Sequence, residues 1–154
     1  LAPGLRLGWI QGNGELFDLL RDSALLQSGG GLAPMTSALL GALLANGKFQ
    51  DNLAMLRRTY ATRAEALYQG LKNTFGGQIE MPKPQGGYFL WLSFNDDLDV
   101  SAVREQARKA GVNYLPGNLC SAKGQFSNSM RLCFAWYGEE ELKAACERLG
   151  AVLG

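Results

Sequence analysis

The sequence predicts an α+β fold, in which a small sheet carries helices on one face and a helical segment precedes it. From about Gly77 onward, strand and helix patterns follow one another in the order β-α-β-β-α, which suits a two-layer domain. A long amphipathic helix stands before this region and is positioned to bridge two domains. The first 46 residues do not make a domain, and we interpret them as the end of a larger one.

The N-terminal third combines glycine turns with short apolar helices. One helix is expected over about 15–27 and a second from Pro34 to Asn46, because proline suits a first helical position and Gly47 a helix stop. Between them, Gly29–Gly31 is expected to form a flexible turn; glycines also let backbone approach a ligand, but a plain turn is the simpler interpretation.

The strongest periodic segment predicts one helix over about 49–75. Its apolar positions are spaced by threes and fours, with charged residues between them, and Gly76-Gly77 ends it. The stripe consists of Leu53, Leu56, Tyr60, Ala64, Leu67, Leu71 and Phe75.

Strands and helices alternate over the remainder. The stretches "GGYFLWLSF", "VNYLP" and "MRLCFAW" are expected to be strands, and the mostly apolar first one is expected to be buried. Between the first two, Asp99 is a plausible N-cap of a helix that stops at Gly111. The last helix begins with three glutamates from Glu139, which are favourable at the positive end of a helix.

Composition excludes several classes of function. The 154 residues carry 15 basic and 14 acidic side chains, and this balance gives no electrostatic case for nucleic acid or an anionic membrane. No apolar run approaches the roughly 20 residues of a membrane span. The chain has no histidine, so a Ser-His-Asp or Cys-His site and a histidine metal site are excluded within it. The three cysteines have no C-x-x-C spacing, which favours reduced thiols in the core over a disulfide framework. A cytoplasmic location is expected.

Three residues are candidates for binding. On "MRLCFAW", Met130, Leu132, Phe134 and Trp136 are expected on one face, which places Arg131 on the opposite face of small residues. A guanidinium there is a good receptor for a carboxylate, although an arginine at a solvent-exposed edge or in an internal salt bridge is the simpler interpretation. Arg6 follows a Pro-Gly turn. At this position an arginine either binds a phosphate or is simply exposed to solvent at a loop. Tyr114 suits a ligand-facing ring or, more simply, ordinary packing.

Five stretches in this order resemble one family: "LAPGLRLGW", "SGGGLAP", "GGYFLWL", "VNYLPGNLC" and "MRLCFAW". The chain looks like the C-terminal part of a fold-type I, pyridoxal-phosphate-dependent class I/II aminotransferase, of the 2-aminoadipate aminotransferase-like branch. The resemblance implies that 1–46 is a remnant of the large cofactor-binding domain and that 47–154 is the small C-terminal domain.

The resemblance also assigns roles. Arg6 corresponds to the arginine that pairs with the phosphate of pyridoxal 5'-phosphate, and Arg131 to the one that holds the α-carboxylate of the amino acid. The lysine that binds the cofactor as a Schiff base typically lies two residues before the position of Leu1. It is absent here, so no catalytic residue and no metal ligand is assigned, and the chain alone is expected to be inactive and not to bind the cofactor stably.

Departures and alternatives accompany the resemblance. Cys120 stands where relatives often carry phenylalanine, and Cys133 where a small polar residue is common, which bears on substrate preference. The implied partners are amino-acid and 2-oxo-acid substrates and a second subunit in a homodimer. Three alternatives stay open: the aminotransferase-like effector domain of a transcription regulator, a non-catalytic binding or structural module, and a carbon–sulfur lyase on the same fold.

Overall fold

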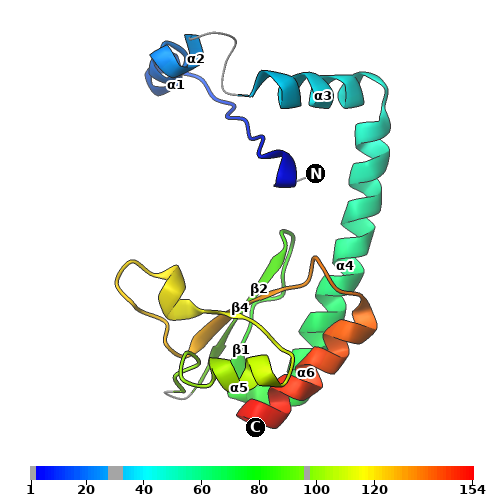
Figure 1. Cartoon of the computed structure of the whole chain (residues 1–154), viewed down its shortest axis with the longest axis vertical. Helices are drawn as coiled ribbons and strands as arrows, with labels where there is room; N and C mark the ends of the chain where they lie inside the picture. The colour runs from blue at the N-terminus through cyan, green and yellow to red at the C-terminus, as the bar shows by residue number, and fades with distance from the viewer. Residues whose placement is uncertain (1–2, 28–32, 96–97) are drawn as a thin grey trace. The chain divides into compact units, whose positions relative to one another are not determined.

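The computed structural model describes residues 3–27, 33–95 and 98–154 (Figure 1). The chain divides into two compact units, which are Leu1–Leu56 and Arg57–Gly154. The elements of the first are the 3-10 turn η1 (Pro3–Leu5) and the helices α1 (Glu15–Arg21), α2 (Ala24–Gln27) and α3 (Pro34–Ala45). Helix α4 (Lys48–Phe75) runs through the boundary between the units. The expected turn at Gly29–Gly31 lies outside the described residues.

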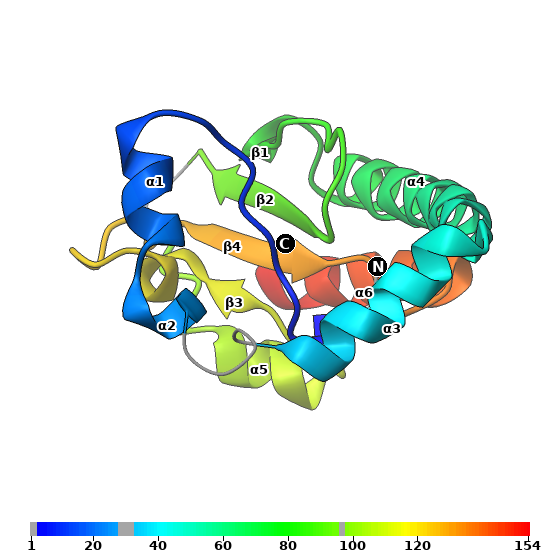
Figure 2. The same cartoon turned by 90° about the horizontal axis from the view of Figure 1, so that it is seen from above.

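The second unit contains the sheet. Its elements after α4 are η2 (Gly76–Gln78), β1 (Ile79–Glu80), β2 (Phe89–Phe94), α5 (Arg104–Lys109), β3 (Leu115–Pro116), η3 (Gly117–Cys120), β4 (Ser129–Cys133) and α6 (Glu139–Leu153). The strand order is β1-β2-β4-β3, and every neighbouring pair is antiparallel. Figure 2 shows β4 between β2 and β3, with α5 and α6 behind the sheet. The expected α+β fold with helices on one face is confirmed.

Alternation along the two central strands creates the core. On β2, Leu90, Leu92 and Phe94 are buried, whereas the residues between them are exposed or half-buried. The buried side chains pack with those of the three helices of this unit in one cluster. From the helices and β4, that cluster includes Leu67, Leu71, Phe75, Ala107, Met130, Leu132, Leu142, Cys146 and Leu149. A single apolar layer therefore joins α4, α5 and α6 to one face of the sheet.

Helices α4 and α6 pack closely where glycine removes a side chain. A Cβ built on Gly70 lies 2.7 Å from Sγ of Cys146, and one built on Gly150 overlaps Cγ2 of Thr74. The Thr74 hydroxyl donates a hydrogen bond of 2.9 Å to the Gly70 carbonyl, which fixes the side chain. Burial raises the pKa of the Cys146 thiol to about 11, so this sulfur stays protonated in the helix contact at neutral pH.

Most helix bounds agree with the sequence patterns. Helix α4 begins one residue before the expected start, and positive φ at Gly47 and Gly76 marks its two flanks. Helix α6 begins at Glu139 as expected, and the Glu141 carboxylate accepts a 2.9 Å hydrogen bond from the Gly138 backbone N–H. The predicted N-terminal helices are confirmed except for one break: α1 ends at Arg21 and α2 starts at Ala24.

Two expectations were wrong in detail. Asp99 does not cap a helix: its carboxylate accepts a 2.9 Å hydrogen bond from the Ser101 backbone N–H, which forms a local turn, and α5 begins only at Arg104. Trp136 does not join the core face: β4 ends at Cys133, the alternation of buried residues reaches only Phe134, and Trp136 beyond it is 81% exposed. Strand β1 was not predicted at all, since two residues carry no periodicity.

The described residues of the first unit form no core of their own. Within its described residues none is buried, and neither α1, α2 nor α3 contributes a buried side chain. Its exposed large apolar side chains are Leu5, Trp9, Ile10, Leu16, Leu19, Leu20, Leu25, Leu26, Met35, Leu39, Leu44 and Met55. An exposed apolar surface of this kind is typical of a segment that packs on another surface.

The close α4–α6 packing predicts an unusual response to substitution. Gly150→Ala should lower the free energy of unfolding by about 1–3 kcal/mol, because the added methyl overpacks the helix contact, although alanine favours a helix by up to about 1 kcal/mol. Thr74→Ser removes the opposing methyl and keeps the hydroxyl, so the double variant should recover most of that loss in urea unfolding. A stabilising Gly150→Ala would show that the helices are not in close contact there.

Candidate substrate-binding face of the sheet

The face of the sheet opposite the helices carries the candidate site. On it lie Phe89, Trp91 and Ser93 of β2 with Ser129, Arg131 and Cys133 of β4, because both strands alternate with period two. Arg131 is half-buried, whereas Met130 and Leu132 beside it are buried in the core, so its expected orientation is confirmed. We call this side the open face.

Arg131 lies in the middle of the sheet rather than at its rim. Strand β4 pairs with strands on both sides, and the partners of Arg131 are Trp91 on β2 and Leu115 on β3. A side chain on a central strand is held by two ladders of backbone hydrogen bonds. The expectation of an arginine at a solvent-exposed edge is therefore wrong.

An aromatic ring rather than a carboxylate contacts the guanidinium. Cζ of Arg131 lies 4.1 Å from the centroid of the Phe89 ring. Among the described residues, no carboxylate lies within ion-pair distance of Arg131, so the interpretation as an internal salt bridge has no support in this part of the chain. Within the described residues, no ion pair neutralises its charge.

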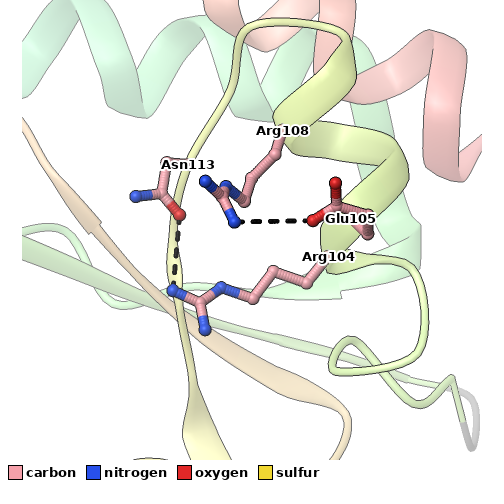
Figure 3. A network of polar contacts seen from close by, with 4 residues as sticks. All are labelled: Arg104, Glu105, Arg108 and Asn113. Atoms are coloured by element: carbon pink, nitrogen blue, oxygen red, sulfur yellow. Dashed lines mark hydrogen bonds and ion pairs between the residues drawn. The ribbon is translucent and has the colours of Figure 1, made fainter.

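The two arginines of α5 differ from Arg131 in that they have polar partners. Figure 3 shows Nη2 of Arg104 against Oδ1 of Asn113 and Nη1 of Arg108 against the Glu105 carboxylate, each contact at 3.5 Å. Both guanidinium groups thus have polar partners from their own surroundings. These contacts are long and exposed, and they stabilise the unit little.

Arg6 lies in the other unit, just after η1. Its side chain is exposed, and its backbone φ of 52° lies in the left-handed region, where non-glycine residues are uncommon. No carboxylate from the described part of the chain forms an ion pair with it. Neither of the two candidate arginines thus forms an ion pair with a described residue.

The remaining candidates divide clearly. Tyr114 is 4% exposed, and its hydroxyl donates a 2.6 Å hydrogen bond to the Val100 carbonyl, so it is a packing residue. Burial also raises the pKa of its hydroxyl. All three cysteines are free thiols: Cys120 and Cys133 are exposed and Cys146 is buried, so the expectation that all of them are core residues is wrong for the first two.

Cavity size does not identify the site. A cavity of about 550 Å³ lies against α4 and α6 and is lined mainly by small and polar side chains such as Thr62, Gln69 and Asn73. It contains no residue of the open face.

Among the described residues, no cluster of acidic and cysteine side chains could hold a metal ion. No described helix is long and apolar enough to cross a membrane.

Sequence reasoning missed the aromatic surroundings of Arg131. Phe89 and Trp91 were assigned to a buried strand, but only alternate residues of β2 face the core. Trp91 contacts Phe126 edge to face at 5.8 Å between centroids, and Phe89 contacts Tyr88 at 6.4 Å. The signal lay in the pairing of "YFLWL" with "MRLCF", which needs the strand register.

Comparison with known proteins gives the class of the chain. The model of the family described as aminotransferase class I and II matches residues 1–149. The chain belongs to this family, and the expected α+β fold of its C-terminal part agrees with the solved structures that it resembles.

Two solved aminotransferases are among the structures that the chain resembles. The kynurenine aminotransferase of Pyrococcus horikoshii superposes with a TM-score of 0.87 at 26% identity, covering 99% of this chain and 38% of that one. The α-aminoadipate aminotransferase LysN of Thermus thermophilus, solved with N-(5'-phosphopyridoxyl)-L-leucine, gives a TM-score of 0.70 at 27% identity over 79% of this chain and 31% of that one.

A regulator is also similar. The HTH-type transcriptional regulator NorG of Staphylococcus aureus is 27% identical over 150 residues, which are 97% of this chain and 33% of that protein. The chain spans little more than a third of the length of the curated relatives that it matches.

Proposed function

We propose that this chain supplies the C-terminal part of a pyridoxal-phosphate-dependent aminotransferase, which moves an amino group between an amino acid and a 2-oxo acid. The observation that carries this proposal is the family match across residues 1–149. The phosphopyridoxyl-leucine bound to LysN supports the choice of cofactor and of substrate class. The proposed domains are 1–46, from the large domain, and 47–154, the small domain.

Arg131 is the proposed receptor for the substrate carboxylate. A guanidinium presents a planar fork of donors that matches the two oxygens of a carboxylate. Its place on a central strand, with no carboxylate partner among the described residues, supports this role, because no internal ion pair has to break before substrate binds. Its half-buried position also strengthens a charge-assisted hydrogen bond relative to one in bulk water.

Arg6 is the proposed ligand of the cofactor phosphate. Its exposed guanidinium and its left-handed backbone fit an anion that holds the side chain in place, since strained backbone is often retained at functional sites. When bound, pyridoxal phosphate supplies an electron sink for the carbanion formed when the amino-acid Cα loses its proton. The two arginines bind and orient, and neither moves that proton.

The proton-transferring group is proposed to lie outside this chain. In the family, the cofactor lysine precedes the position of Leu1, so we propose that the chain alone is inactive. A second subunit is also proposed: the apolar side chains exposed on α1 and α3, such as Leu16, Leu19 and Leu39, supply the surface for a large domain and a homodimer partner.

A regulator is the second candidate, and the similarity to NorG favours it. In that case the same unit serves as the effector domain of a DNA-binding protein. A helix-turn-helix domain encoded upstream in the same reading frame would decide for the regulator, and a complete large domain without one would decide for the enzyme.

Loss of the Arg131 guanidinium should impair catalysis by the full-length enzyme. Arg131→Ala removes a charge-assisted carboxylate contact worth about 1.5–3 kcal/mol, so kcat/KM for amino acids should fall by about ten- to a hundredfold. Arg131→Lys should restore it only in part, because an ammonium lacks the planar fork. Arg108→Ala is the matched control and should leave steady-state kinetics unchanged; an equally active Arg131→Ala enzyme would refute the assignment.

The chain alone should show no selective reaction with pyridoxal phosphate. Ion pairs of 2.8 Å with Glu65 and Glu140 raise the pKa values of Lys83 and Lys143, so these amines stay protonated and react poorly at neutral pH. After borohydride reduction and peptide mapping, labelling should be substoichiometric and spread over several lysines. Stoichiometric modification of a single lysine would mean that the chain has a cofactor site of its own.

A further inference from the structure

The contact between Phe89 and Arg131 follows from the strand register. Phe89 pairs with Cys133 and Trp91 pairs with Arg131, so Phe89 and Arg131 are diagonal neighbours on the open face. Diagonal pairs on antiparallel strands come within reach when one side chain is aromatic and the other long. The 4.1 Å between the guanidinium carbon and the ring centroid is well inside the range of a cation–π contact.

A ring contact and a carboxylate contact do not compete for the same part of the guanidinium. The five N–H donors of arginine lie in the plane of the group, whereas an aromatic ring interacts with the face of a guanidinium that stacks on it. A guanidinium so held keeps its donors and loses rotational freedom. Fewer orientations then remain to be lost when a carboxylate binds.

The ring itself is anchored to the long helix. Tyr88 contacts Phe89 edge to face, and the Tyr88 ring contacts Tyr60 of α4 at 5.3 Å between centroids with an interplanar angle of 89°. The Tyr88 carbonyl also accepts a 3.0 Å hydrogen bond from the Phe134 backbone N–H, just past β4. Three aromatic rings therefore connect α4 to Arg131, all within the Arg57–Gly154 unit.

We propose that Phe89 is a positioning residue for carboxylate recognition: its ring, braced by Tyr88 and Tyr60, pre-orients the Arg131 guanidinium on the open face. The proposal rests on the assignment of Arg131 as the carboxylate receptor. It adds that affinity for the carboxylate depends on an aromatic face at position 89 and not merely on an apolar side chain there.

The first test measures the contact itself in the 154-residue chain. The Arg131 Nε–H resonance is identified by its loss in Arg131→Lys and should lie upfield, because the Phe89 ring current shields it. Phe89→Leu should move it downfield. Phe126→Leu is the matched control, since that ring is similarly exposed, 53% against 45%, and contacts Trp91 rather than Arg131. An Nε–H resonance that does not move in Phe89→Leu would overturn the proposal.

The second test measures recognition in the full-length enzyme. Phe89→Leu should raise KM for both the amino acid and the 2-oxo acid by about two- to tenfold, as expected for one cation–π contact, with a smaller change in kcat. Phe89→Tyr keeps the aromatic face and should restore KM, and Phe126→Leu should leave it unchanged. In the Arg131→Ala background, Phe89→Leu should add no further loss.

The outcomes separate the two claims. If Arg131→Ala leaves turnover unchanged, the proposed function fails, whatever Phe89 does. If Arg131→Ala impairs turnover but Phe89→Leu leaves KM unchanged, or raises it equally in both backgrounds, only the positioning role fails. Phe89→Met, which keeps apolar bulk without a ring, should reproduce the Phe89→Leu result, and it replaces that variant if leucine prevents folding.

Discussion

The one-sided burial of the sheet is the constraint on which the other features of the Arg57–Gly154 unit depend. Because side chains alternate along β2 and β4, covering Leu90 and Leu132 with helices forces Phe89 and Arg131 onto the other face. A one-residue slip of register would bury the guanidinium and expose the core. The packing that stabilises the fold therefore also determines which side chains a ligand can reach.

The close contact of α4 with α6 stabilises the helical layer that covers one face of the sheet. Glycines at 70 and 150 let the two helices approach, and both helices then reach the same apolar layer against the sheet. The first unit lacks any such layer among its described residues. This difference supports the proposal that residues 1–46 belong to the large domain.

Much of this fold could be predicted from the sequence, for physical reasons that differ between elements. The apolar stripe of α4 repeats from Leu53 to Phe75 within a helix of 28 residues, which makes a strong periodic signal, whereas the two residues of β1 carry no pattern. The side-chain turn at Asp99 and the end of β4 before Trp136 depend on local competition and on strand pairing. Arg131 could be placed on a face from alternation alone, but the ring of Phe89 against it required the register.

Amide hydrogen exchange along the whole chain tests most directly whether the sheet and its helices form a self-sufficient unit that presents Arg131. Amides of β2, β4, α6 and residues 57–75 of α4 should exchange slowly, close to the rate set by global unfolding, because they surround the buried layer. Amides of α1, α2 and α3 should exchange orders of magnitude faster. Equal protection in both groups would contradict the account, since it would show that the first unit has a core of its own.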